Sequence, residues 1–133
     1  EIKEATRMTS SCGIACNKML AKICSDFKKP DGQTYLEPDD KKIEAFMIKL
    51  PVRKLPGVGK INEQILAGLG VISCQDAIDK QCEIYLNFTE NAFDYLARAC
   101  LGIAKNIHED QGIKKSLNIS ETFNPTQDYE TIK

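Results

Sequence analysis

The sequence predicts a mostly α-helical fold with a few short strands, which is the α+β class. Strand, helix and strand patterns follow one another over residues 1–38. From residue 39 to residue 105, apolar residues recur at helical spacing in short segments that small-residue turns separate. One more alternating segment follows at residues 115–123. We therefore expect a compact helical subdomain attached to the edge of a small α/β or α+β layer.

The first 38 residues are predicted to form that edge. Residues 9–15 are predicted to be a short strand, in which Gly13 marks a bend or a close approach of backbones. Asn17 should cap a helix that ends near Asp26, before turn-forming residues 30–32. A brief strand at residues 33–38 then closes at Pro38. The apolar stripe of the helix consists of Met19, Leu20, Ile23 and Cys24.

Short helices should make up residues 39–105. The first starts at Asp39 and Asp40 and is stopped by Pro51. Further helices are predicted at residues 60–69, 74–79, 81–86 and 90–104. The last of these should turn Phe93, Leu96, Ala97, Cys100 and Leu101 inward. Residues 106–114 show no periodicity and are predicted to be a linker, and residues 115–123 a strand. A lone strand needs a partner, so we expect a piece of a longer protein, an expectation that the start on Glu1 supports.

Composition excludes a uniformly basic nucleic-acid binder. The 18 Lys and Arg residues against 19 acidic residues give a net charge of −1, so any anion-binding surface must be local. No apolar run approaches the ~18 residues of a membrane span, and we expect a monomer without membrane contacts. The six cysteines and two glycosylation sequons leave a secreted disulfide-bonded domain as an alternative. Because C-x-x-C pairs are absent, a zinc site has little support.

The segment LPGVGK, residues 55–60, predicts a phosphate-binding turn. A P-loop would need a glycine at Lys54, and a dinucleotide fingerprint would need one at Asn62, so both patterns fail. A helix-hairpin-helix remains, with a short helix near residues 51–54, a glycine hairpin, and a helix from Lys60. A plain helical turn is the alternative interpretation.

We expect the hairpin amides to hold one backbone phosphate without reading bases. The two glycines are predicted to adopt positive φ and to leave the amides of Gly57, Gly59 and Lys60 bare at the positive end of a helix. The cations around the turn favour this interpretation over a neutral turn; they are Lys49, Arg53, Lys54 and Lys60. The predicted phosphate-binding residues are Arg53, Lys54, Gly57, Val58, Gly59 and Lys60.

Three runs of the sequence resemble the Y-family DNA polymerases that copy past lesions, most of all the kappa type. They are SSCGIACNKMLAKICSDFKKPDGQ, LPVRKLPGVGK and KKSLNISETF, which keep the family order and a similar spacing from residue 9 to residue 123. The resemblance implies that residues 1–38 end the palm, 39–105 form the thumb, 106–114 are a linker and 115–133 begin the little finger. It also implies a nuclear protein whose hairpin grips primer-template DNA, with a monovalent cation at the hairpin carbonyls.

The resemblance gives Lys29 a role at the triphosphate of the incoming deoxynucleotide, whereas the residues alone favour a solvated lysine near a helix C-terminus. It also implies a parent nucleotidyltransferase that uses two Mg²⁺ ions. The metal-binding carboxylates of the family have no counterpart in this sequence, because Asp39-Asp40 and Glu109-Asp110 suit capping or solvated roles. We therefore expect no catalytic or metal-binding residue here and an inactive fragment. The alternative is a free-standing helix-hairpin-helix module of a DNA-repair factor.

Overall fold

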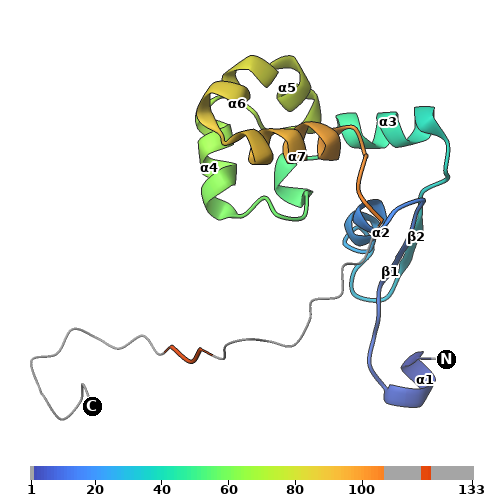
Figure 1. Cartoon of the computed structure of the whole chain (residues 1–133). Helices are drawn as coiled ribbons and strands as arrows, with labels where there is room; N and C mark the ends of the chain where they lie inside the picture. Colours follow the sequence, from blue (N-terminus) through green and yellow to red (C-terminus); the bar gives the residue numbers. More distant parts are fainter. Residues whose placement is uncertain (1, 107–117, 121–133) are drawn as a thin grey trace, which may run out of the picture.

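The computed structural model describes residues 2–106 and 118–120 and confirms a mostly helical α+β fold (Figure 1). In chain order the elements are α1 (Ile2–Thr6), β1 (Cys12–Ile14), α2 (Lys18–Cys24), β2 (Gln33–Tyr35), α3 (Asp40–Ile48), the 3₁₀ helix η1 (Val52–Lys54), α4 (Lys60–Gly68), α5 (Cys74–Asp79), α6 (Gln81–Asn87) and α7 (Glu90–Cys100). Figure 1 shows α4 to α7 gathered into a bundle, while α2 lies beside β1 and β2.

The N-terminal unit is a parallel pair of strands with one helix packed on it. Gly13 of β1 pairs with Thr34 of β2, and Ile14 pairs with Tyr35. Both strands are shorter than predicted. Pairing begins at Cys12, whose partner Gln33 directly follows the turn at residues 30–32, and it ends at Ile14 with Tyr35. A parallel pair needs a crossover between its strands, and α2 supplies it.

Local caps define the ends of the helices. The Asn17 side chain accepts a hydrogen bond of 2.8 Å from the Leu20 amide, and Asp39 caps α3 in the same way through the Lys42 amide. Asn17 also donates to the Gly102 carbonyl at 2.8 Å, which ties the start of α2 to the segment after α7. The sequence therefore predicted both caps correctly, and one of them also joins the two parts of the fold.

Helix α7 ends at Cys100, four residues before its predicted end. Gly102 adopts a φ of +77°, and its amide donates to the Ala99 carbonyl, which closes the helix. The predicted inward face is wrong at Leu101, which is 55% exposed beyond the last helical residue, whereas Ala99 is buried. Leu96 and Cys100 are buried as predicted.

One apolar core joins the two parts of the fold. Its fully buried side chains come from α2, α3, the hairpin and the bundle, and the largest are Leu20, Ile23, Met47, Leu55, Leu66, Val71 and Ile84. Among the described residues, no polar or charged side chain is fully buried. Burial of this apolar surface, at roughly 25 cal/mol per Å², supplies the main driving force for folding.

All six cysteines lie in the described part of the chain and carry unpaired thiols. Cys24 and Cys100 are buried on apolar helix faces, as the sequence predicted, and Cys74 is buried with them. A hydrogen bond with the Cys100 thiol, together with burial, raises the pKa of the Cys74 thiol. These three side chains therefore serve as small apolar groups of the core.

Helix α5 starts with a capping box that also positions η1. The Ser73 side chain accepts from the Asp76 amide, while hydrogen bonds from the Ser73 and Ile72 amides lower the pKa of the Asp76 carboxyl. Next to this cap, the Val52 amide donates to the Ile72 carbonyl at 2.9 Å and the Cys74 amide donates to the Leu50 carbonyl at 2.9 Å. The segment that leads into the hairpin is thereby fixed against the start of α5.

Several predictions fall outside the described residues. Apart from residues 118–120, which form no regular secondary structure, the predicted strand at 115–123 lies there, as do the paired acids Glu109 and Asp110. Within the described residues, no helix is both long and apolar enough to cross a bilayer.

Candidate nucleic-acid interface

The turn between η1 and α4 is anchored by apolar side chains that point into the core. Val52, Leu55 and Val58 are each no more than 6% exposed. The Val58 amide donates to the Leu55 carbonyl at 3.1 Å, and the Leu55 amide donates to the Val52 carbonyl at 3.1 Å. The hairpin is therefore held from its inner side, while Gly57, Gly59 and Lys60 are exposed.

The two glycines of the hairpin differ in conformation. Gly57 has a φ of +89°, which a residue with a Cβ rarely adopts, so glycine is required there. The predicted positive φ at Gly59 is wrong, because Gly59 has φ −80° and ψ 177°, an extended conformation open to any residue. Apart from Gly59 itself and its two chain neighbours, no heavy atom lies within 4 Å of a Cβ built at Gly59. Gly59 therefore leaves open space in front of α4.

The backbone amides predicted to bind phosphate belong to residues at or just before the N-terminus of α4. Within the described part of the chain, the amides of Gly57, Gly59 and Lys60 donate to no protein acceptor. Gly59 is the N-cap of this nine-residue helix and offers no side-chain cap. Free amides at the positive end of a helix are suited to an anionic oxygen.

The cations around the hairpin fall into two groups. Lys49, Lys54 and Lys60 are exposed and form no ion pair with a carboxylate of residues 2–106 or 118–120. Arg53 is instead engaged within the hairpin, because its guanidinium Nη1 donates to the Val58 carbonyl and its Nε lies 3.2 Å from Glu63 Oε2. The sequence predicted their clustering but not this division.

Tyr95 is a residue of the site that the sequence analysis missed. From α7, its hydroxyl donates to the Pro56 carbonyl, and its ring lies 3.5 Å from the position of a Cβ built at Gly57. Burial raises the pKa of the Tyr95 phenol. This contact joins residues 39 positions apart, and no local pattern in the sequence signals it.

Lys29 belongs to the N-terminal unit, in the turn that follows α2, and not to the bundle that carries the hairpin. Its Nζ lies 2.5 Å from Asp26 Oδ1, and this ion pair lowers the pKa of the Asp26 carboxyl. Both side chains are more than a third exposed, so the pair contributes little to stability. The Lys29 ammonium group therefore lies at the surface, paired with Asp26 and open to solvent.

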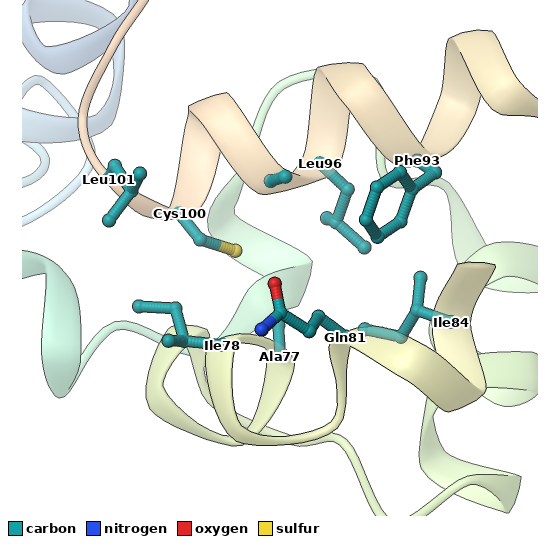
Figure 2. A pocket seen from close by; sticks show the side chains of 9 residues that line it. Ala77, Ile78, Gln81, Ile84, Phe93, Leu96, Cys100 and Leu101 are labelled. Carbon is teal, nitrogen blue, oxygen red and sulfur yellow. The ribbon is translucent and has the colours of Figure 1, made fainter.

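Two further features of the described residues concern metal binding and cavities. Among these residues, there is no group of three or more His, Cys, Asp or Glu residues that could hold a metal ion. A cavity of about 90 Å³ lies among α5, α6 and α7, where Figure 2 shows Phe93, Leu96 and Cys100 opposite Ile78 and Ile84. Gln81 supplies its only strongly polar side chain, so this cavity is a gap in apolar packing rather than an anion site.

These features together define a helix-hairpin-helix domain. Residues 40–71 match the family described as "IMS family HHH motif", and residues 1–26 match the impB/mucB/samB family. The chain belongs to the Y family of DNA polymerases, to which its similarity extends over most of its length.

Relatives and solved structures agree on this family. The chain is 37% identical to DNA polymerase kappa of Homo sapiens over 92% of its own length and 40% identical to DNA polymerase IV of Stenotrophomonas maltophilia over the same share. The chain spans 14% and 34% of the lengths of these two relatives. The structure of a DinB family error prone DNA polymerase from Sulfolobus solfataricus superimposes with a TM-score of 0.67 and 28% identity, covering 76% of this chain and 30% of that one.

Proposed function

We propose that this chain is a DNA-binding part of a Y-family DNA polymerase and that its hairpin holds one backbone phosphate of primer-template DNA. The observation that carries this proposal is the group of unpartnered amides at the N-terminus of α4, from Gly57, Gly59 and Lys60. The names of the related polymerases support it.

The geometry suits a phosphate better than a base. Amide donors accept any anionic oxygen and carry no pattern that distinguishes bases, so the contact is independent of sequence. The open space in front of Gly59 allows a phosphate to approach the helix end closely. Exposed Lys54 and Lys60 add positive charge beside it. The buried Val58 side chain keeps the amides in place.

For the whole protein, the proposed activity is nucleotide transfer to a primer end, including synthesis past lesions. Divalent ions, with Mg²⁺ as the proposed metal, would activate the primer hydroxyl and neutralise phosphate charge. The described residues do not fit such ions, since they hold no suitable cluster of carboxylates. We therefore assign no catalytic step to them. Lys29 is proposed to contact the triphosphate of the incoming deoxynucleotide.

The proposed organisation places the end of the palm at residues 1–38, the thumb at 39–105, a linker at 106–114 and the start of the little finger at 115–133. The match of residues 40–71 to the helix-hairpin-helix family supports the thumb assignment. A monomer in the nucleus is proposed from the similarity to eukaryotic kappa polymerases, although bacterial relatives are of comparable identity.

The chain should bind duplex DNA weakly and without sequence preference. A single hairpin with a few cations neutralises ~2 to 4 phosphates, so affinity should fall about 10- to 150-fold between about 50 and about 200 mM salt. Fluorescence anisotropy with two duplexes of unrelated sequence measures both properties. Tight, base-specific or salt-independent binding would contradict the proposal.

Lys29→Ala, in a polymerase that carries this chain, should lower kcat/KM for the incoming nucleotide. Loss of a charged contact to phosphate predicts a reduction of about 10- to 100-fold. The Kd for primer-template should change much less than kcat/KM, because Lys29 lies outside the bundle that carries the hairpin and is linked to it through Asp26, on which Lys54 also acts. Lys28→Ala removes the adjacent exposed charge and serves as the matched control. An unchanged kcat/KM with weaker DNA binding would instead make Lys29 a duplex-facing lysine.

A further inference from the structure

Protein donors already engage three of the hairpin carbonyls, where the family resemblance implies a monovalent cation. A cation at this turn would use backbone carbonyl oxygens that face it. Here the Leu55 carbonyl accepts from the Val58 amide, and the Pro56 carbonyl accepts from the Tyr95 hydroxyl. The Val58 carbonyl accepts from the Arg53 guanidinium. Each of these three oxygens has one donor from the protein and keeps a second lone pair, so the positive charge of Arg53, more than the hydrogen bonds, opposes a second cation here.

The donor at Val58 carries a full positive charge. A guanidinium stays protonated at any ordinary pH, and its planar donors are fixed relative to one another. Arg53 Nη1 reaches the Val58 carbonyl, while Nε lies 3.2 Å from Glu63 Oε2 in α4. The charge is thus held from two sides, between the turn and the helix that the turn leads into.

We infer that Arg53 is the built-in cation of this hairpin and takes the place of a bound monovalent metal ion. Its role is to position the turn: it neutralises the partial charge of the Val58 carbonyl and links η1 to α4. Lys54, the next residue, is exposed and forms no ion pair within residues 2–106 or 118–120, although its charge, after that of Lys29, also acts on Asp26. This inference concerns the same site as the proposed DNA binding and rests on it for its functional meaning. That Arg53 takes the place of a bound cation does not itself depend on DNA binding.

The test compares the full chain in potassium chloride and in choline chloride at equal ionic strength, because choline is too large for a carbonyl site. For the wild-type chain, we expect the same Tm and the same duplex Kd in both salts. Arg53→Met keeps the length of the side chain without the charge, and it should lower Tm in choline by on the order of 5 °C. Potassium should restore part of that loss, because the Val58 carbonyl is then vacant and no guanidinium charge repels a cation from the turn.

Matched variants separate charge from position. Lys54→Met removes the neighbouring charge, and its Tm should be the same in potassium chloride and in choline chloride. Arg53→Lys keeps a positive charge, so its Tm in choline should lie between those of the wild type and Arg53→Met. A wild-type Tm that rises specifically with potassium would overturn the inference. So would an Arg53→Met chain that is equally unstable in both salts, because Arg53 would then be an ordinary structural side chain.

The wild-type comparison needs no variant, so the inference stays testable if Arg53→Met does not fold. The two proposals also fail in different ways. If the chain binds no duplex, the proposed function fails while the Tm comparison still decides the role of Arg53. If duplex binding holds and the wild-type Tm depends on potassium, only the role of Arg53 fails.

Discussion

Gly13→Ala should strongly destabilise the N-terminal unit. A Cβ at Gly13 would lie 1.9 Å from the Ala21 carbonyl oxygen and 2.5 Å from the Ser25 amide nitrogen. Both are backbone atoms of the α2 region, so relief requires the helix to move away from β1. Overpacking costs typically about 1–3 kcal/mol, and occasionally more, and a backbone clash this close belongs at the upper end or beyond. Urea unfolding followed by circular dichroism measures the loss.

Gly68→Ala is the matched control for this prediction. Gly68 lies in α4, and no heavy atom outside its own helix and neighbours lies within 4 Å of its built Cβ. Alanine there should leave the stability unchanged or raise it by less than the about 1 kcal/mol of a helix-interior site, because Gly68 is the last residue of the helix. Equal free energies of unfolding for the two variants would contradict the close packing of α2 on β1.

The sequence predicted the helices well because their signals are local. The caps at Asn17 and Asp39 need only residues three positions away, and the apolar stripes need only one helical period. The predicted end of α7 was wrong although a local signal existed, since Gly102 is a glycine beyond the helix and closes it. The apolar residues Ile103 and Ala104 extended the helical pattern past that signal.

The hairpin shows where sequence reasoning stops. LPGVGK predicted the turn and its exposed amides, because glycine spacing before a helix restricts the backbone. It could not assign the positive φ to Gly57 alone, since either glycine can adopt it. The contacts of Tyr95 with Pro56 and of Arg53 with Val58 depend on how helices pack and on how a side chain turns. A count of charges in the sequence therefore cannot distinguish Arg53, which binds within the hairpin, from the neighbouring exposed lysines.

Gly57→Val should weaken duplex binding more than Lys60→Ala does. Valine at a φ of +89° is strained by roughly 1–3 kcal/mol, and the turn can relieve that strain only by changing its backbone angles. Such a change moves the amides away from a common phosphate. Because hydrogen bonds to a charged oxygen contribute about 1.5–3 kcal/mol, we expect a Kd at least about tenfold higher.

Gly59→Val should act on DNA binding by a different physical cause from Gly57→Val. Its backbone is extended and its built Cβ meets no heavy atom within 4 Å, so the fold should tolerate the substitution. Any loss of DNA binding would come from the side chain occupying the space in front of the α4 amides. We therefore expect Gly59→Val to keep the wild-type Tm while weakening duplex binding, whereas Gly57→Val should lower both.

Lys60→Ala provides the comparison that separates amides from charge. Lys60 is one of several exposed cations, so its loss should lower the slope of log K against log salt by ~0.9 and leave most of the affinity. Anisotropy titrations at several salt concentrations, with Tm measured for each variant, give the affinity, the slope and the state of folding together. If Lys60→Ala alone abolished binding while folded Gly57→Val and Gly59→Val chains bound normally, the lysine charge and not the amide group would hold the phosphate. Retention of binding by Lys60→Ala with loss in Gly57→Val would assign the phosphate to the backbone of the hairpin, because the two variants differ in whether they disturb the amides or only the surrounding charge.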